Sequence, residues 1–433
     1  MRWSQTLIPT LKETPEGAEI ASHVLMLRAG VIRQVAAGAY AYLPLGVRAL
    51  RKAEQLIRRE FDTIGAAELA VPALTPVSLL DRTGRTDDLG DELIRLTLGR
   101  QGRSTQLALA PADDEVVANL TSPLLSSYRQ LPITFHQLAT RFRNEPRPRL
   151  GLLRTREFLT HNAYSFNPSP ESLDGSYGAV SAAYRRVFDR LGLDYLMGEA
   201  GPGSVSHEFV VPAEIGEHTI VYCRECGYTA NRESAEVGPL GTPASEAPRE
   251  PVSAVDTPNA TTIDDVSRML GCRPTEMIKT LVYLADSKPL VVLIRGDHEA
   301  NEAKIRMATG ADKLELAPDE VIERVTGAPV GFASPVGLDE EIPIWADRDV
   351  ELMRNAVTGA NRADTHLRGV NPKRDFQVRA FADLRNAVDG DPCPRCSSTV
   401  ALRRTILLAR TIKLADRFSE PLTAHFLDDQ EQQ

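Results

Sequence analysis

The sequence lacks long apolar runs and has few cysteines. No stretch of about 18 apolar residues occurs among its 433 residues, so no membrane-spanning helix and no membrane partner are expected. The opening segment, MRWSQTLIPTLKE, does not have the apolar core of a signal peptide. Five cysteines, four of them in two CxxC pairs, fit a reducing compartment better than a disulfide framework. These features predict a cytoplasmic protein.

Acidic residues outnumber basic ones overall, but positive charge is dense in one segment. The net charge is −9, yet six arginines fall within residues 141–156. Strand-like runs rich in β-branched and aromatic residues flank the segment at 133–140 and 157–166. A guanidinium donates two parallel hydrogen bonds and stays charged, so such a cluster favours a local phosphate ligand. A solvated arginine-rich hairpin is the alternative.

The arginine segment resembles motif 2 of class II aminoacyl-tRNA synthetases, an aromatic-Arg-x-Glu strand, a loop, and then Arg-x-x-x-Phe. The corresponding elements are FRNE at 142–145, and Arg154 followed by Phe158. The wider sequence is similar to bacterial prolyl-tRNA synthetases. The resemblance implies a site for ATP with Mg²⁺ formed by Arg143, Glu145, Arg154 and Phe158, in which Arg143 has the catalytic role of neutralising the α-phosphate.

The part of the chain before this segment is similar to the same family. The segment 18–38 is helix-like, and residues 46–62 have the apolar spacing of an amphipathic helix. A strand-like LAVPAL follows at 69–74. A long helix followed by a proline-ended strand resembles motif 1, which forms the dimer interface in class II enzymes, so a homodimer is expected. An ordinary core helix with an edge strand is the alternative.

Two segments are similar to the amino-acid pocket of the family. APADDE at 110–115 stands where the family has Gly-Pro-Thr-His-Glu-Glu, so Asp114 would hold the substrate amine while Ala112 replaces the threonine. His207 and Glu208 match a Ser-His-Glu-Phe segment that lines the same pocket. The implied ligand is proline or an analogue. The acidic run could instead reflect the preference of helix N-termini for carboxylates.

The two CxxC pairs are Cys223 with Cys226 and Cys393 with Cys396. Four thiolates can hold a tetrahedral zinc ion. The separation of about 165 residues is too long for a simple finger, but it is explained if an inserted domain brings its two ends together. A structural Zn²⁺ is therefore predicted, with four reduced cysteines without metal as the alternative.

The sequence between the CxxC pairs has the organisation of an inserted domain. Residues 238–260 are rich in proline and small polar residues, as in a linker. Residues 261–380 then alternate helix-like segments with buried-strand runs, a pattern typical of an α/β domain. This domain resembles the editing insertion of bacterial prolyl-tRNA synthetases, which hydrolyses alanyl-tRNA made in error.

The resemblance also assigns roles within this domain. Lys279 would contact the anionic acceptor end of tRNA. Backbone N–H groups of the loop with Gly331, Ser334 and Pro335 would face the ester carbonyl of the substrate. His366 would position the ester or its attacking water, so Lys279 and His366 are the predicted catalytic side chains.

The expected fold is α+β, with a class II antiparallel sheet core at 1–237 and 381–433 and the editing domain inserted at 261–380. The last segment is expected to end before motif 3, without the anticodon-binding domain. The family reaction is ATP-dependent ligation of proline to tRNA(Pro), with editing of alanyl-tRNA(Pro). Two alternatives are a stand-alone trans-editing deacylase of mischarged tRNA and a non-catalytic paralogue that acts as a regulator or binding partner.

Overall fold

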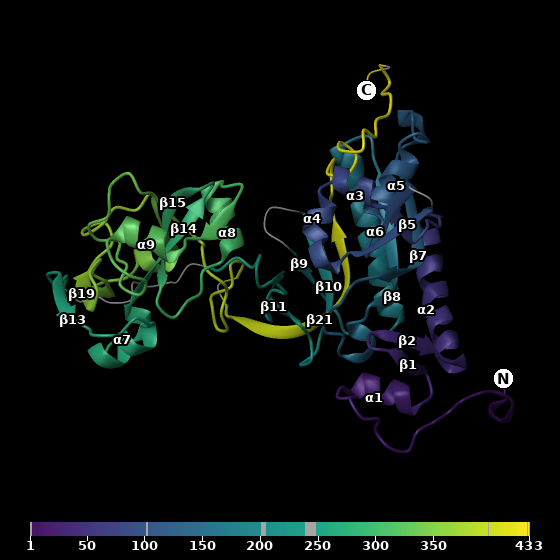
Figure 1. Cartoon of the computed structure of the whole chain (residues 1–433), viewed down its shortest axis with the longest axis horizontal. Helices are drawn as coiled ribbons and strands as arrows, with labels where there is room; N and C mark the ends of the chain where they lie inside the picture. The colour runs from purple at the N-terminus through teal and green to yellow at the C-terminus, as the bar shows by residue number, and fades with distance from the viewer. Residues whose placement is uncertain are drawn as a thin grey trace. The chain divides into compact units, whose positions relative to one another are not determined.

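The structure is a computed structural model of the chain (Figure 1). It describes residues 2–100, 103–200, 205–238, 248–396, 398–430 and 432. Residues 239–247, which belong to the predicted linker, lie outside the described residues. The chain divides into two compact units, the first formed by Met1–Asp194 with Thr411–Gln433 and the second by Tyr195–Arg410.

The first unit is built on a sheet of order β3–β7–β8. Strands β7 (Ile133–Phe142) and β8 (Glu157–Phe166) pair antiparallel along their whole length, and β3 (Ala67–Glu68) joins β7 in parallel. Helices α2 (Pro44–Asp62) and α6 (Pro170–Arg190) lie side by side (Figure 1) and bury a cluster around Phe61 with residues of β8. The predicted strands on either side of the arginine segment are confirmed, as is the amphipathic helix.

The helix expected within 18–38 is shorter than its pattern suggested. Helix α1 covers Ala21–Arg28, and strand β1 (Ile32–Ala36) follows. Gly30 lies between them with a φ of +67°, a left-handed conformation that ends a right-handed helix. The following IRQVA then pairs with strand β2 (Ala39–Tyr42).

The strand expected at 69–74 is wrong over most of its length. Only Leu74 belongs to a strand, at the start of β4 (Leu74–Pro76), which pairs with β6. Pro72 has no backbone N–H to give to a strand ladder, and this explains why residues 69–73 are irregular.

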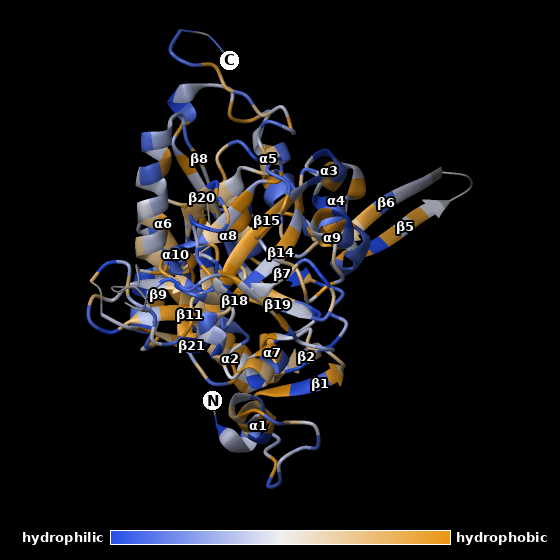
Figure 2. Cartoon of the chain, turned by 90° about the vertical axis from the view of Figure 1, so that its left-hand side faces the viewer, coloured by the Kyte–Doolittle hydropathy of each residue, from blue (hydrophilic) through white to orange (hydrophobic). Residues whose placement is uncertain are grey.

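The remaining elements of the first unit surround this sheet. They are 3₁₀-helices Trp3–Gln5, Gly90–Glu92, Tyr128–Gln130 and Gly151–Leu153, helices α3 (Val77–Arg82), α4 (Arg85–Leu89) and α5 (Asp114–Thr121), and strands β5 (Ile94–Arg100) and β6 (Arg103–Leu109). Strands β5 and β6 form an antiparallel ribbon that extends away from α3 and α4 (Figure 2).

The second unit contains a closed barrel of order β10–β21–β11–β12–β9. Its strands are β9 (Leu196–Glu199), β10 (Ser206–Pro212), β11 (His218–Cys223), β12 (Thr229–Asn231) and β21 (Val400–Ile412), of which the last two residues belong to the first unit. The antiparallel pairing of β11 with β21 runs from His218 opposite Thr405 to Cys223 opposite Val400. The chain before the predicted insertion therefore meets the chain after it.

The rest of the second unit forms a five-stranded mixed sheet and a three-stranded sheet. The large sheet has the order β16 (Leu314–Leu316), β14 (Ile278–Ala285), β15 (Lys288–Arg295), β17 (Ile344–Asp347), β20 (Ala380–Ala382), and the small one β13 (Ser253–Asp256), β19 (Thr365–Val370), β18 (Ala356–Gly359). The helices are α7 (Ile263–Leu270), 3₁₀ Pro274–Glu276, α8 (Glu302–Thr309), α9 (Asp319–Thr326) and α10 (Arg348–Glu351). Strand β15 is apolar along most of its length (Figure 2), because apolar clusters cover both of its faces.

Candidate functional sites

The β7–β8 hairpin brings the predicted nucleotide residues together. Arg143 directly follows β7, where its N–H donates to the Arg156 carbonyl at 2.8 Å. Its guanidinium carbon lies 5.4 Å from the centre of the Phe158 ring, in cation–π geometry. The Arg143 side chain is 41% exposed, and its Nε is 4.0 Å from a Glu92 carboxylate oxygen. Arg143 and Phe158 thus form one surface that a planar anionic ligand could approach.

Glu145 organises the arginines of the loop. Its side chain is 2% exposed and accepts a hydrogen bond from Arg154 Nε at 2.7 Å and one from the Arg147 N–H at 3.0 Å. The Glu145 carbonyl also accepts from Arg156 Nε at 2.9 Å. The hydrogen bond from Arg154 is the main cause that lowers the pKa of Glu145. Glu145 is therefore a fixed anion, and Arg154 is paired with it here.

A buried ion pair fixes the start of α5 against β7. Asp113, just before α5, accepts from Arg141 Nε at 2.8 Å and from Gln137, and both Asp113 and Arg141 are 1% exposed. Burial nevertheless raises the pKa of Asp113, because desolvation outweighs the attraction to Arg141. The pair places the neighbouring Asp114 beside the strand that leads into the arginine loop.

Asp114, the predicted ligand of the substrate amine, is already ion-paired. Arg85 Nη1 donates to its carboxylate at 2.8 Å, and the two side chains are 15% and 20% exposed. Arg85 Nε also lies 3.6 Å from the fully buried Glu115, which accepts from the Thr83 hydroxyl at 3.1 Å. Burial raises the pKa of Glu115. Sequence reasoning missed Arg85, because nothing in the spacing of an arginine 29 residues away indicates this contact.

The predicted His207 lies on β10 in the second unit, opposite Glu199 of β9. Its neighbour Glu208 is 2% exposed and accepts from Arg410 and, at 3.3 Å, from Asn231 Nδ2. Asp114 belongs to the first unit, so the joint pocket expected for the two residues stays a prediction.

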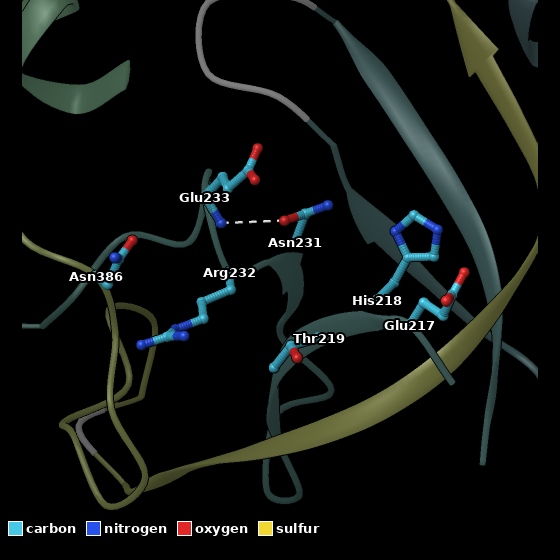
Figure 3. Close-up of a pocket in the computed structure, with 7 residues that line it drawn as sticks. All are labelled: Glu217, His218, Thr219, Asn231, Arg232, Glu233 and Asn386. Atoms are coloured by element: carbon cyan, nitrogen blue, oxygen red, sulfur yellow. Dashed lines mark hydrogen bonds between the residues drawn. The ribbon is translucent and has the colours of Figure 1, made fainter. Parts of the chain in front are cut away.

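A polar pocket of about 270 Å³ lies beside Glu208 in the second unit. Its lining residues are Glu217, His218, Thr219, Asn231, Arg232, Glu233 and Asn386 (Figure 3). Asn231 connects the two features, because it bonds Glu208 and also accepts from the Glu233 N–H at 3.0 Å. Figure 3 shows Arg232 extending toward the side of Asn386, away from Glu217 and His218. No sequence motif indicated this pocket.

The predicted editing loop and His366 lie side by side. His366, on β19, is 3% exposed, and its ring centre is 5.6 Å from that of Phe332. His366 pairs with Gly359 of β18, and a Cβ on Gly359 would come within 2.2 Å of the Phe332 carbonyl oxygen. The His366 Nδ1 is 2.6 Å from the Thr257 hydroxyl, and burial lowers the pKa of His366. A neutral imidazole is thus held next to the loop.

The loop backbone is partly engaged in its own hydrogen bonds. The Ser334 N–H donates to Asn361 Oδ1 at 2.7 Å, and the Phe332 N–H donates to the Pro329 carbonyl at 3.3 Å. Pro335 is buried and has no N–H. Within the described residues, no such bond involves the N–H of Gly331 or Ala333. These two are the donors left for a substrate oxygen.

Gly331 has a backbone that only glycine adopts readily. Its φ is +98°, and a Cβ there would lie 2.7 Å from the Thr261 Cβ. The loop therefore depends on glycine at this position for both conformation and space.

Lys279 lies on β14, next to the strand that carries Gly359. Its Nζ donates to the His298 carbonyl at 2.9 Å, and burial lowers the pKa of Lys279. The adjacent Thr280 has its hydroxyl 3.5 Å from that of Thr358 on β18. Lys279 thus lies on a strand of the five-stranded sheet that contacts β18, whereas His366 lies on β19, which pairs with β18 in the three-stranded sheet. A direct contact between Lys279 and His366 is not observed among the described residues, so their joint action stays a prediction.

The four CxxC cysteines come together. Their sulfur atoms all lie within 4.8 Å of one another, with 3.6 Å between Cys223 and Cys396 and between Cys226 and Cys393. Zinc–thiolate bonds of about 2.3 Å in a tetrahedron require sulfur separations of about 3.8 Å. The spacing and the donor set fit a tetrahedral metal ion, so these residues form a possible four-cysteine metal site.

Comparisons with known proteins agree with this architecture. Residues 257–376 match the aminoacyl-tRNA editing domain family, which overlaps the predicted insertion, so the chain is a protein with an aminoacyl-tRNA editing domain. It is 47% identical to the proline–tRNA ligase of Geotalea daltonii over 433 residues, which are 99% of this chain and 75% of that protein. The proline–tRNA ligase of Citrifermentans bemidjiense is 46% identical with the same coverage. The chain belongs to the proline–tRNA ligase family.

Among solved structures, the chain is similar to the Giardia lamblia prolyl-tRNA synthetase in complex with prolyl-adenylate. The two sequences are 21% identical over the aligned part, which covers 46% of this chain and 42% of the Giardia chain, and the TM-score is 0.41. Across the described residues, no helix is both long and apolar enough to cross a membrane.

Proposed function

We propose that the second unit hydrolyses the ester bond of mischarged alanyl-tRNA(Pro). The observation that supports it most directly is the contact of His366 with the loop of Gly331, Ser334 and Pro335 inside the matched editing domain. Water adds to the ester carbonyl, the bond to the ribose oxygen breaks, and the proton from water passes to that oxygen. The products are alanine and tRNA with a free terminal hydroxyl.

The residues have separate roles in this step. The N–H groups of Gly331 and Ala333 would stabilise the negative charge that develops on the carbonyl oxygen, a contribution typically worth about 10²-fold or more per donor. His366, fixed through Nδ1 by Thr257, would orient the ester or the water through Nε2. Lys279 would attract the phosphate groups of the tRNA end.

We also infer that the first unit binds ATP, with Mg²⁺ on the phosphates, and activates proline. Arg143 would neutralise the α-phosphate, Phe158 would stack on adenine, and Glu145 would hold the loop. Arg154 would have to exchange its contact with Glu145 for the γ-phosphate. The family ligates proline to tRNA, and a homodimer is expected for it. We further propose that the four-cysteine site holds a structural Zn²⁺ and that His207 contributes to the amino-acid pocket.

Two assays on one preparation test these proposals. Alanyl-tRNA(Pro) should lose its alanine much faster with the protein than without it, and Lys279→Met or His366→Ala should abolish the effect. Lys288→Met is the matched control, because this exposed lysine lies on the same hairpin. An unchanged half-life of alanyl-tRNA(Pro) would contradict the deacylase. Proline-dependent ATP–pyrophosphate exchange tests the activation site, and no exchange with any amino acid would exclude it.

A further inference from the structure

A buried arginine joins the editing domain to the four-cysteine site within the second unit. Arg385 lies outside the matched range 257–376 and is 1% exposed. Its Nε donates to Asp349 at 2.9 Å, and its two Nη atoms donate to both oxygens of Asp391 at 2.7 and 2.8 Å. Asp347 lies 3.8 Å away. One side chain thus bridges α10 and the loop that carries the second CxxC pair.

The contacts continue from Asp349 to Lys279. His298 is 1% exposed, and its Nδ1 lies 3.3 Å from the Asp349 carboxylate. Arg295 donates to His298 Nε2 at 2.9 Å, so Nδ1 carries the proton and faces Asp349, although the contact is not aligned well enough to count as a hydrogen bond. The His298 carbonyl accepts from Lys279 Nζ at 2.9 Å.

On the other side of Arg385, the series of contacts continues through Asp391 to the four cysteines. Asp391 is 6% exposed, accepts the Val388 N–H at 2.7 Å, and its own carbonyl accepts the Val400 N–H at 2.8 Å. It precedes Cys393 by two residues. Cys393 packs in an apolar cluster with Cys223 and Val400. A metal ion that fixes the sulfur atoms would therefore also fix the backbone that holds Asp391.

We propose that Arg385 is a positioning residue of the deacylation site, and that metal binding by the four cysteines sets its position through Asp391. This inference rests on the proposed deacylase. The bidentate pairing allows Arg385 only one orientation, because its guanidinium must donate to both oxygens of Asp391 and to the carboxylate of Asp349 at the same time. If the metal is absent and the loop opens, Arg385 loses one anchor. Asp349 and His298 then lose their fixed partner, and the carbonyl that holds Lys279 is released.

Hydrogen–deuterium exchange of the full chain tests the proposal without relying on activity. Zinc content is measured first, and the metal is then removed with a chelator under reducing conditions. Removal should increase exchange around Arg295 to His298 by about tenfold, in addition to any change near the cysteines, since losing about 1.4 kcal/mol of local stability has that effect. Restoring zinc should reverse it. A chain that binds no zinc when supplied with it would overturn the proposal.

Two variants separate this route from general damage. Asp391→Asn keeps the shape but removes the charge that pairs with Arg385, so the zinc-loaded variant should show the same raised exchange at Arg295 to His298. Asp389→Asn is the matched control, because the exposed Asp389 accepts from the Leu402 N–H at 3.0 Å and an amide oxygen can do the same. Unchanged exchange at Arg295 to His298, both on zinc removal and in Asp391→Asn, would refute the coupling.

Deacylation kinetics add a second readout on the same samples. Asp391→Asn should lower the deacylation rate at saturating alanyl-tRNA while zinc content stays at the wild-type level. A wild-type protein without deacylase activity would reject the proposed function, yet the exchange experiment would still decide whether the metal controls the environment of Lys279. The two failures are therefore distinguishable.

Discussion

The charge of the acids at the start of α5 should decide how strongly this protein prefers an amino acid with a positively charged amine. Asp114 is the acid that the family resemblance assigns to the amine, but Arg85 holds it at 2.8 Å with both side chains largely buried. The pair is locally neutral. The site should therefore discriminate weakly between proline and tetrahydrofuran-2-carboxylate, an analogue in which a ring oxygen replaces the amine.

Replacing Arg85 with glutamine should increase that discrimination. The change leaves Asp114 available to the ammonium, and a hydrogen bond to a charged group contributes about 1.5–3 kcal/mol, or about 10- to 100-fold in binding. Asp114→Asn should have the opposite effect, because it removes the carboxylate assigned to the amine and leaves Arg85 paired with Glu115 alone. The ratio of the two dissociation constants is the quantity to compare, since general damage to the pocket affects both ligands alike.

Isothermal titration calorimetry with the two ligands measures this ratio. Arg82→Gln is the matched control, because Arg82 lies on the neighbouring α3 and donates to the Pro421 carbonyl at 2.9 Å. Arg85→Gln also leaves the buried Glu115 without a nearby cation, so its melting temperature should fall and must be checked. A folded Arg85→Gln protein whose ratio equals that of the wild type would refute the charge argument.

Three further predictions concern stability and the two sites. Burial lowers the pKa of His161 to about 3, so between pH 6.5 and 3 the unfolded chain binds a proton that the folded chain does not. The free energy of unfolding should therefore decrease as the pH falls from 6.5 toward 3. In His161→Phe, the free energy of unfolding measured with urea should depend less steeply on pH over this range. Gly331→Ala should abolish deacylation and lower the melting temperature, because Thr261 and the positive φ both exclude a Cβ. Glu145→Gln should strengthen ATP binding in a titration, by up to about tenfold, since Arg154 then leaves a neutral amide instead of a carboxylate when it moves to the γ-phosphate.

Sequence patterns predicted the parts of the structure that depend on local order. The strands around the arginine loop were predictable because β-branched and aromatic residues fill both. The motif also named Arg143 and Phe158, which are in contact, while their role in binding ATP stays a prediction. The four cysteines were grouped correctly because only an insertion explains their spacing. The helix predicted within 18–38 is too long, because apolar spacing alone does not reveal that Gly30 adopts a left-handed backbone conformation that ends the helix.

Contacts between distant segments could not be predicted in the same way. Arg85 and Arg385 each pair with carboxylates, but a sequence with 59 acidic residues offers many equivalent partners for any arginine. Burial selects the partner, because a charged side chain that is removed from water is stable only where the fold places an opposite charge next to it. The same limitation applies to the loop of the editing site, where the engagement of the Ser334 N–H with Asn361 became visible only in three dimensions.

Buried ion pairs support both candidate sites: two lie at the start of α5, and that of Arg385 is linked to Lys279 through Asp349 and His298. Asp113 and Asp114 meet Arg141 and Arg85, and Asp391 meets Arg385. Buried ion pairs add little net stability compared with apolar packing, but breaking one partner is costly, so each pair strongly favours a single arrangement of its elements. The charged groups left for ligands are then the more exposed ones, Arg143 among them. On this argument the buried pairs determine where the sites are, and the exposed residues determine what they bind.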